Sequence, residues 1–428
     1  MENSKIVKVR EIFFLIIFTL IIFQNPLMNL HSNFRYIDEF CFVLSVIYII
    51  FYLCIYRKCE KIYIGMIAVM ALMALVGIIS NFKSDVERSI YIIVLDIVYF
   101  TKDFICFIAA GLYFRRKRVG RGFVNVFTAE IHFILLIAFV CLCISQFVDI
   151  GMTRGVRYGI PCFKFIYSNA GMWSQYGILF LFVLTADLQM NRLNYKRIFY
   201  FALLFIVWLF SCRSRAFVTA AIWLFFMVVG RKISDIRRAG DHTIRQVLRK
   251  FLKPSYIIFA LCVIFLLGWE QFQGYFGEEA TTARSLLFSG GLSIMKDYFP
   301  FGSGFGTFGT EIAAQYYSPL YYRYGLSSFW ALTEGGSELT DCYWPAVGAE
   351  MGLFGVVLAA VLILLFFKVF IQSTRGYKYF SIATITYCVY LLISSTATGI
   401  FASYITAGFL IVCMAVINVD QTKRIEGA

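Results

Sequence analysis

The sequence predicts an all-α integral membrane protein with about twelve transmembrane helices and one long outer loop between helices 9 and 10. Hydrophobic residues make up 60% of the 428 residues and charged residues only 15%, whereas charged residues are about 25% of a typical soluble domain. Apolar runs long enough to cross roughly 30 Å of hydrocarbon recur along the chain. Lys and Arg gather on alternate connections between these runs, as cytoplasmic loops require. We therefore expect residues 1–428 to form a single polytopic membrane domain.

Each predicted span is an apolar run near the length that a bilayer requires. In chain order the runs are 12–30, 39–56, 62–80, 90–114, 123–148, 169–186, 198–212, 216–230, 255–269, 345–367, 379–393 and 399–418. Most connections in compact folds are about 4 to 6 residues long, so the interval 271–344 is too long to serve only as a connector. Long loops of this kind usually carry function.

Basic residues on alternate connections set the predicted orientation. They cluster near the N-terminus and at 57–61, 115–121, 192–197, 231–253 and 368–378. By the positive-inside rule these connections and both termini are cytoplasmic, in the cytoplasmic (inner) membrane, and 271–344 lies outside. Since this topology accounts for most of the net charge of +14, the charge does not indicate nucleic acid binding.

The cysteines and histidines show no pattern typical of a metal site. The chain has 12 Cys and three His, with no CxxC pair, and most of the Cys lie inside apolar runs. Such residues are typically small buried side chains. We therefore expect no metal and no cofactor. The first apolar run is too long for a cleavable signal peptide, and it has no small-residue cleavage site.

Two arginines interrupt the apolar stretch 198–230, within Ser211-Cys212-Arg213-Ser214-Arg215. A single helix over this stretch would be about 50 Å long and would bury both arginines at mid-bilayer. Two short helices fit better, with the turn between them near the outer headgroup layer. An arginine at that depth is costly unless it meets a partner, water or an anion. Arg215 is predicted to grip the phosphate of a lipid-linked substrate, because guanidinium binds phosphate bidentately; snorkelling to phospholipid headgroups is the alternative.

Other charged residues stand where topology disfavours them. Arg154, Arg157 and Lys164 lie in the predicted outer connection 149–168, which suggests either a site for an anionic glycan or pyrophosphate, or a solvated loop. Asp96, Lys102 and Asp103 fall inside the fourth span. Intramembrane charges can mark an ion path, but pairing within the helix bundle is the favoured interpretation.

The long loop contains two further candidates. Arg284 opens a predicted amphipathic helix that runs to about Met295 and would lie on the membrane, leaving Arg284 free to point at the site. Asp341 stands just before Pro345, where the chain re-enters the bilayer. It could accept the proton of a sugar hydroxyl or cap the next helix. The glycine-rich turn 300–309 is a weak signal alone, because it opens no nucleotide-binding helix.

These residues resemble the O-antigen polymerase and ligase superfamily. The segment 212–216 is similar to its Ser-Arg-Gly/Ala turn, and Arg284 followed by 300–306 resembles its arginine plus Pro-x-Gly-x-Gly element. The segments 341–344 and 350–355 are similar to its closing motif, in which Cys342 replaces the usual Asn or Ser.

The resemblance implies metal-independent glycosyl transfer at the outer leaflet, with undecaprenyl-pyrophosphate-linked oligosaccharides as donor and acceptor, in O-antigen or capsule biosynthesis. Arg215 and Arg284 would hold the pyrophosphate leaving group, and Asp341 would orient or deprotonate the acceptor hydroxyl. The further substrate-binding candidates are Arg154, Arg157, Lys164, Arg213 and Arg323. The expected protein partners are a chain-length regulator and a flippase.

Aspartate at position 341 favours a repeat-unit polymerase, because the family's lipid A ligases typically have histidine there. A ligase that moves finished polymer to another acceptor is one alternative. A glycolipid flippase or other transporter is the second, although transporters generally have short outer loops and a site near the midplane.

Overall fold

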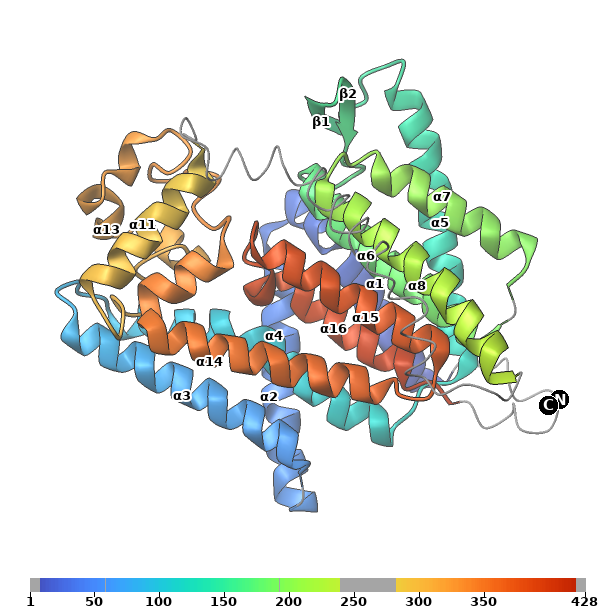
Figure 1. The fold of residues 1–428 in the computed structure, drawn as a ribbon, viewed down its shortest axis with the longest axis horizontal. Helices are drawn as coiled ribbons and strands as arrows, with labels where there is room; N and C mark the ends of the chain where they lie inside the picture. The colour runs from blue at the N-terminus through green and yellow to red at the C-terminus, as the bar shows by residue number, and fades with distance from the viewer. Residues whose placement is uncertain (1–7, 58, 192, 239–281, 421–428) are drawn as a thin grey trace.

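The computed structural model describes residues 8–57, 59–191, 193–238 and 282–420, and most of these residues are helical (Figure 1). Six described helical segments are long and apolar enough to cross a membrane. They are α1 (Val9–Leu30), η1 with α2 (Ser32–Tyr36 and Ile37–Tyr56), α3 (Lys61–Lys83), α5 (Arg121–Ser145), α6 (Ala170–Met190) and α14 (Tyr343–Ser373). The chain is therefore a helical protein suited to a membrane.

The other bundle helices are shorter or carry more charge. They are α4 (Ile90–Arg116), α7 (Tyr195–Leu209), α8 (Ser214–Arg238), α15 (Lys378–Ser395), η3 (Ile400–Ala402) and α16 (Tyr404–Ile417). A helix occupies the place of every predicted apolar run except 255–269, which lies outside the described residues. The structure thus agrees with the helix positions expected from the sequence, while six segments meet the length and hydropathy of a span.

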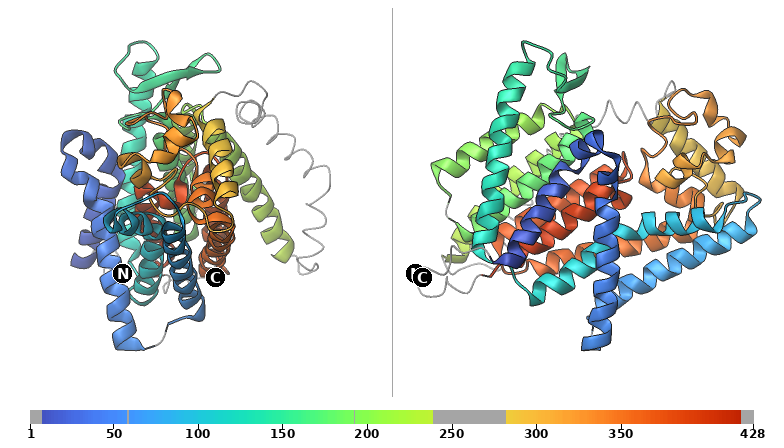
Figure 2. Two further views of the ribbon diagram at one scale, coloured as in Figure 1. Left: turned by 90° about the vertical axis from the view of Figure 1, so that its left-hand side faces the viewer. Right: turned by 180° about the vertical axis from the view of Figure 1, so that it is seen from behind.

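Helix α6 forms the centre of the bundle, and nearly all of its residues are buried. It packs against α5, α7, α15 and α16, while α4 packs on α2 and α16. One end of helix α2, by contrast, projects beyond the neighbouring helices (Figure 2), and the helix exposes large apolar side chains such as Phe40, Ile47 and Phe51. Exposed apolar surface of this extent is typical of a face that contacts lipid.

The described part of the long predicted loop folds into a lobe beside α3 and α14 (Figure 1). It contains α11 (Ala283–Asp297), α12 (Glu311–Gln315), α13 (Pro319–Arg323) and η2 (Leu326–Ser328). A cluster of its own fills the interior, with Leu287, Ile294, Phe308, Leu320 and Tyr321 almost inaccessible to solvent. Leu287 and Ile294 give α11 the apolar face of an amphipathic helix, as predicted. The helix packs on α14 and Arg284 pairs with Asp341, so the prediction that Arg284 is free is wrong.

The predicted all-α fold also includes one short hairpin. Strands β1 (Thr153–Arg157) and β2 (Ile160–Phe163) pair antiparallel, with an irregular register between Thr153 and Val156. The backbone N–H of Phe163 donates to the carbonyl of Phe210 at 2.8 Å, just after α7. The hairpin is therefore fixed against the turn that carries Arg213 and Arg215.

Candidate functional site

The turn between α7 and α8 is positioned by two tryptophans. The Trp173 indole donates to the carbonyl of Val207 at 2.8 Å, and the Trp208 indole donates to the carbonyl of Ser174 at 2.9 Å. Gly177 makes room for Trp208, because a Cβ there would lie 2.1 Å from the indole ring. These reciprocal contacts hold the end of α7 against the start of α6, and the turn follows directly.

The stretch 198–230 forms two helices, as predicted, because α7 ends at Leu209 and α8 begins at Ser214. Between them Cys212 adopts a φ of +51°, which is uncommon for a residue with a Cβ. This tight turn places Arg213 directly before α8 and Arg215 in the first turn of that helix.

One hydrogen bond holds the Arg215 side chain, and other N–H donors of its guanidinium group remain available. Its Nη2 donates to the carbonyl of Gly171 at 2.8 Å, and the guanidinium lies 5.8 Å from the ring centre of Tyr390. A guanidinium has five N–H donors, so a single carbonyl bond leaves most of them to other partners. The contact with Gly171 places Arg215 at the first turn of α6.

Arg213 lies within the repulsive field of three other arginines. Burial, together with the positive charges of Arg157, Arg215 and Arg284, lowers the pKa of Arg213 to about 10. Its Nε is buried and has no hydrogen-bond partner among the described residues. The hairpin, the α7–α8 turn and the first turn of α11 therefore carry arginines whose positive charges all act on Arg213.

Arg284 and Asp341 are in direct contact, although 57 residues separate them. Nε and Nη2 of Arg284 donate to Oδ2 of Asp341 at 3.0 and 2.8 Å. Helix α11 approaches α14 closely enough for this contact because it carries a glycine at the crossing. A Cβ on Gly291 would lie 2.9 Å from the Cβ of Pro345. The side chains are 25% and 24% exposed, so the pair remains reachable from solvent.

Asp341 does not cap α14. The N-cap residue of that helix is Cys342, which makes no side-chain capping hydrogen bond. The carboxylate points instead at the arginine, and this agrees with the alternative in which Asp341 serves the site. The carboxylate of Asp341 thus pairs with Arg284, one of the four clustered arginines.

Two other predicted binding residues, Arg154 and Lys164, contact backbone carbonyl groups near the hairpin. Arg154 donates to the carbonyl of Ser168 at 3.4 Å, and Lys164 donates to that of Tyr167 at 3.3 Å. Both therefore contact the loop that follows their own hairpin.

Arg323 lies elsewhere and pairs with Asp85 at 3.0 Å. It also contacts Tyr298, which follows the last turn of α11, whereas Arg284 lies in its first turn. Tyr298 lies roughly 20 Å along α11 from Arg284, at 1.5 Å per residue. Arg323 therefore forms a surface ion pair at the other end of α11, and its predicted role in substrate binding stays a prediction.

The glycine-rich turn is saturated by protein groups. Seven consecutive backbone N–H groups, from Ser303 to Gly309, all donate to protein acceptors at 2.8 or 2.9 Å. The acceptors are the carbonyls of Ala349 and Glu350 and the side chains of Asn81, Asp96, Glu350 and Tyr321. Because none of these donors remains available, the turn is an anchor and not a phosphate cradle.

A break in α14 receives this turn. Gly352 has a φ of +62°, and a Cβ there would lie 2.2 Å from the carbonyl oxygen of Pro300. The N–H of Leu353 donates to that same carbonyl at 3.0 Å. The two glycine-containing segments of the resemblance, 300–306 and 350–355, therefore fit into each other.

Two buried carboxyl groups hold the interlock, and sequence reasoning gave neither this role. Glu350 accepts from the backbone N–H groups of Thr307 and Phe308, and Asp96 accepts from that of Gly306. Asp96 is thus an internal anchor. Bundle pairing, the favoured interpretation of the fourth span, also holds for Lys102, which pairs with Asp38 of α2.

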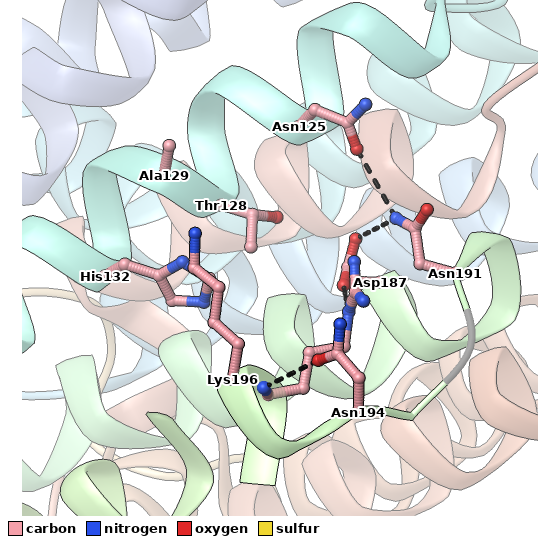
Figure 3. A pocket seen from close by; sticks show the side chains of 9 residues that line it. Asn125, Thr128, Ala129, His132, Asp187, Asn191, Asn194 and Lys196 are labelled. Carbon is pink, nitrogen blue, oxygen red and sulfur yellow. Dashed lines mark hydrogen bonds and ion pairs between the residues drawn. The ribbon is translucent and has the colours of Figure 1, made fainter. Parts of the chain in front are cut away.

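A separate hollow of about 300 Å³ lies at the other end of α6 (Figure 3). Its lining residues are Asn125, Thr128, Ala129, His132, Asp187, Asn191, Asn194, Lys196 and Arg197. Inside it Asp187 is neutralised by Arg197 at 2.6 Å. Asp187 lies roughly 24 Å along α6 from Gly171, at 1.5 Å per residue. This hollow is distinct from the arginine cluster and contains none of the predicted site residues.

A scan against protein-family models finds no match, and a search of curated proteins finds no significant match. Among the residues that the structure describes, no group of three or more His, Cys, Asp or Glu side chains is placed to hold a metal ion. The function must therefore be inferred from the arginine cluster and its carboxylate.

Proposed function

We propose that the protein is a repeat-unit polymerase that joins lipid-pyrophosphate-linked oligosaccharides by glycosyl transfer, in O-antigen or capsule biosynthesis. One observation carries this proposal: the charges of Arg157, Arg215 and Arg284 act on the buried Arg213, and Arg284 in turn pairs with a carboxylate, Asp341. A group of mutually repelling cations is unfavourable in an isolated protein. It becomes favourable when a ligand supplies two or more negative charges, as a pyrophosphate does.

In the proposed reaction, a hydroxyl group of the acceptor sugar attacks the anomeric carbon of the donor sugar. The bond between that carbon and the pyrophosphate oxygen breaks, and the electron pair leaves with the lipid pyrophosphate. Negative charge therefore develops on the leaving group. Arg215 and Arg284 are placed to stabilise that charge, which is the type of electrostatic assistance that contributes most to many enzymatic rates.

Asp341 is the proposed acceptor of the hydroxyl proton. Its Oδ2 accepts both hydrogen bonds from Arg284, and in the proposed reaction Oδ1 receives the proton of the acceptor hydroxyl. When pyrophosphate engages Arg284, the contact between Arg284 and Asp341 weakens and the carboxylate can turn toward the acceptor. The pair thus couples binding of the donor to activation of the acceptor.

The proposed location is the outer face of the cytoplasmic membrane, with both termini in the cytoplasm. Supporting this, the arginine cluster and the polar hollow lie at opposite ends of α6. The basic connection 192–197 belongs to the end with the hollow. By the positive-inside rule that end faces the cytoplasm.

The test is the length of the polysaccharide made by variants of the chain. Arg215→Ala, Arg284→Ala and Asp341→Ala should insert normally, yet give single lipid-linked units in place of a ladder. Normal ladders from all three variants would refute the site. Wild-type protein that transfers finished polymer to lipid A would identify a ligase, and transport without lengthening would identify a flippase.

A further inference from the structure

The hairpin and the arginine turn meet at two cysteines. Cys162 lies on β2 and Cys212 in the turn after α7, and their exposed fractions are 2% and 3%. Together with Ala170 they form a small buried cluster separate from the main core. Both side chains are free thiols in this structure.

The backbone fixes this proximity. The hydrogen bond from Phe163 N–H to the carbonyl of Phe210 joins the neighbours of both cysteines. Their contact therefore does not depend on one favourable side-chain rotamer. Cysteines buried inside the helices of the bundle, such as Cys106 and Cys413, have no such strand-to-turn arrangement.

We propose that Cys162 and Cys212 form a disulfide bond in the mature protein. The proposal rests on the outward orientation given above, because disulfides persist in compartments outside the cytoplasm and are rare within it. The bond would connect β1–β2 to the turn, and so join the segments that carry Arg157 and Arg213. These two guanidinium groups repel each other, and a covalent link would hold them together when no anion is bound.

The chemistry requires a disulfide-bearing thiol oxidoreductase as the oxidant. One cysteine thiolate attacks the oxidant's disulfide and forms a mixed disulfide. The second cysteine then attacks the mixed disulfide, forms the Cys162–Cys212 bond and releases the oxidant as a dithiol. Two electrons and two protons pass from the cysteine pair to the oxidant. Burial raises the pKa of the Cys212 thiol to about 11, so exchange should occur before the hairpin has docked.

The experiment uses the full-length protein expressed in membranes. Cells are quenched in acid, denatured, and treated with N-ethylmaleimide without reductant, and the protein is digested with trypsin. Mass spectrometry should find residues 158–164 joined to residues 198–213, and reduction should remove this species. Cys162→Ser and Cys212→Ser should each abolish it. Recovery of both peptides in alkylated form from the wild type would overturn the proposal.

A second arm separates this proposal from the proposed function. A cysteine placed at exposed Ser328, on η2, is labelled with a membrane-impermeant maleimide in intact cells. Labelling from outside together with reduced Cys162 and Cys212 would refute the disulfide alone. Labelling only after the cytoplasm is opened would refute the orientation, and with it both proposals.

Discussion

Two carboxylates near the start of α14 have opposite environments. Glu350 is fully buried and accepts from two backbone N–H groups. Asp341 is 24% exposed and contacts one guanidinium. The first has partners within the fold, whereas the second belongs to a cluster with surplus positive charge. A resemblance that includes both residues does not distinguish them, but their surroundings give the first a role in folding and leave the second available for the chemistry proposed above.

The largest effect is expected for Glu350→Ala. The substitution leaves the N–H groups of Thr307 and Phe308 buried without an acceptor, and each orphaned group costs about 1 to 3 kcal/mol. The free energy of unfolding should therefore fall by roughly 2 to 6 kcal/mol, measured by thermal unfolding in detergent. Glu350→Gln keeps an acceptor oxygen and is the matched control. Equal losses in both variants would contradict the role assigned to these hydrogen bonds.

Arg284→Ala and Asp341→Asn should lower activity strongly and stability only slightly. Losing one preorganised charge-stabilising group typically slows an enzyme by about 10² to 10³, so chain lengthening should fall by that order. A partly exposed ion pair contributes only about 0 to 1 kcal/mol, so the unfolding midpoint should change little. Arg284→Lys keeps the charge and loses the fork, which makes it the matched control for bidentate binding. If Arg284→Ala lowered the unfolding midpoint as much as Glu350→Ala does, the distinction between the two carboxylates would be lost.

Arg213→Gln should lower activity without lowering stability, so it tests the two properties independently. The substitution removes a cation that Arg157, Arg215 and Arg284 repel. The unfolding midpoint should then equal or exceed that of the wild type, while chain lengthening falls about tenfold, the loss that 1.4 kcal/mol of binding would produce. A lower midpoint with unchanged polymer length would show that Arg213 has a structural role.

Arg323→Ala should have the smallest effect. Arg323 and Asp85 form an ion pair in which their side chains are 45% and 63% exposed, respectively. Such exposed pairs contribute about 0 to 1 kcal/mol. Polymer length should stay within about twofold of the wild type, given that range. A loss as large as that of Arg284→Ala would return Arg323 to the substrate site.

The sequence predicted what depends on local patterns. Apolar runs located the described bundle helices, and two short helices were preferred to one across 198–230 because of Arg213 and Arg215. The helix that follows Thr282 was also predicted from its periodicity. These features follow from helix length and side-chain spacing within one segment.

Partner choice across the fold could not be predicted in the same way. Asp96 was interpreted as a bundle charge, yet it accepts from Gly306, which lies 210 residues away. Contact between Arg284 and Asp341 depends on the close crossing of α11 and α14. Such contacts arise from tertiary packing, and a single sequence carries no local signal for them.

The break at Gly352 also has a mechanical consequence. Because the 300–309 segment packs into that break and is hydrogen-bonded to the residues on both of its sides, the lobe that contains α11 is fixed to α14 and cannot swing about it. If the proposed function is correct, the movement that admits a bulky glycan would have to come from other segments, such as the hairpin and the α7–α8 turn.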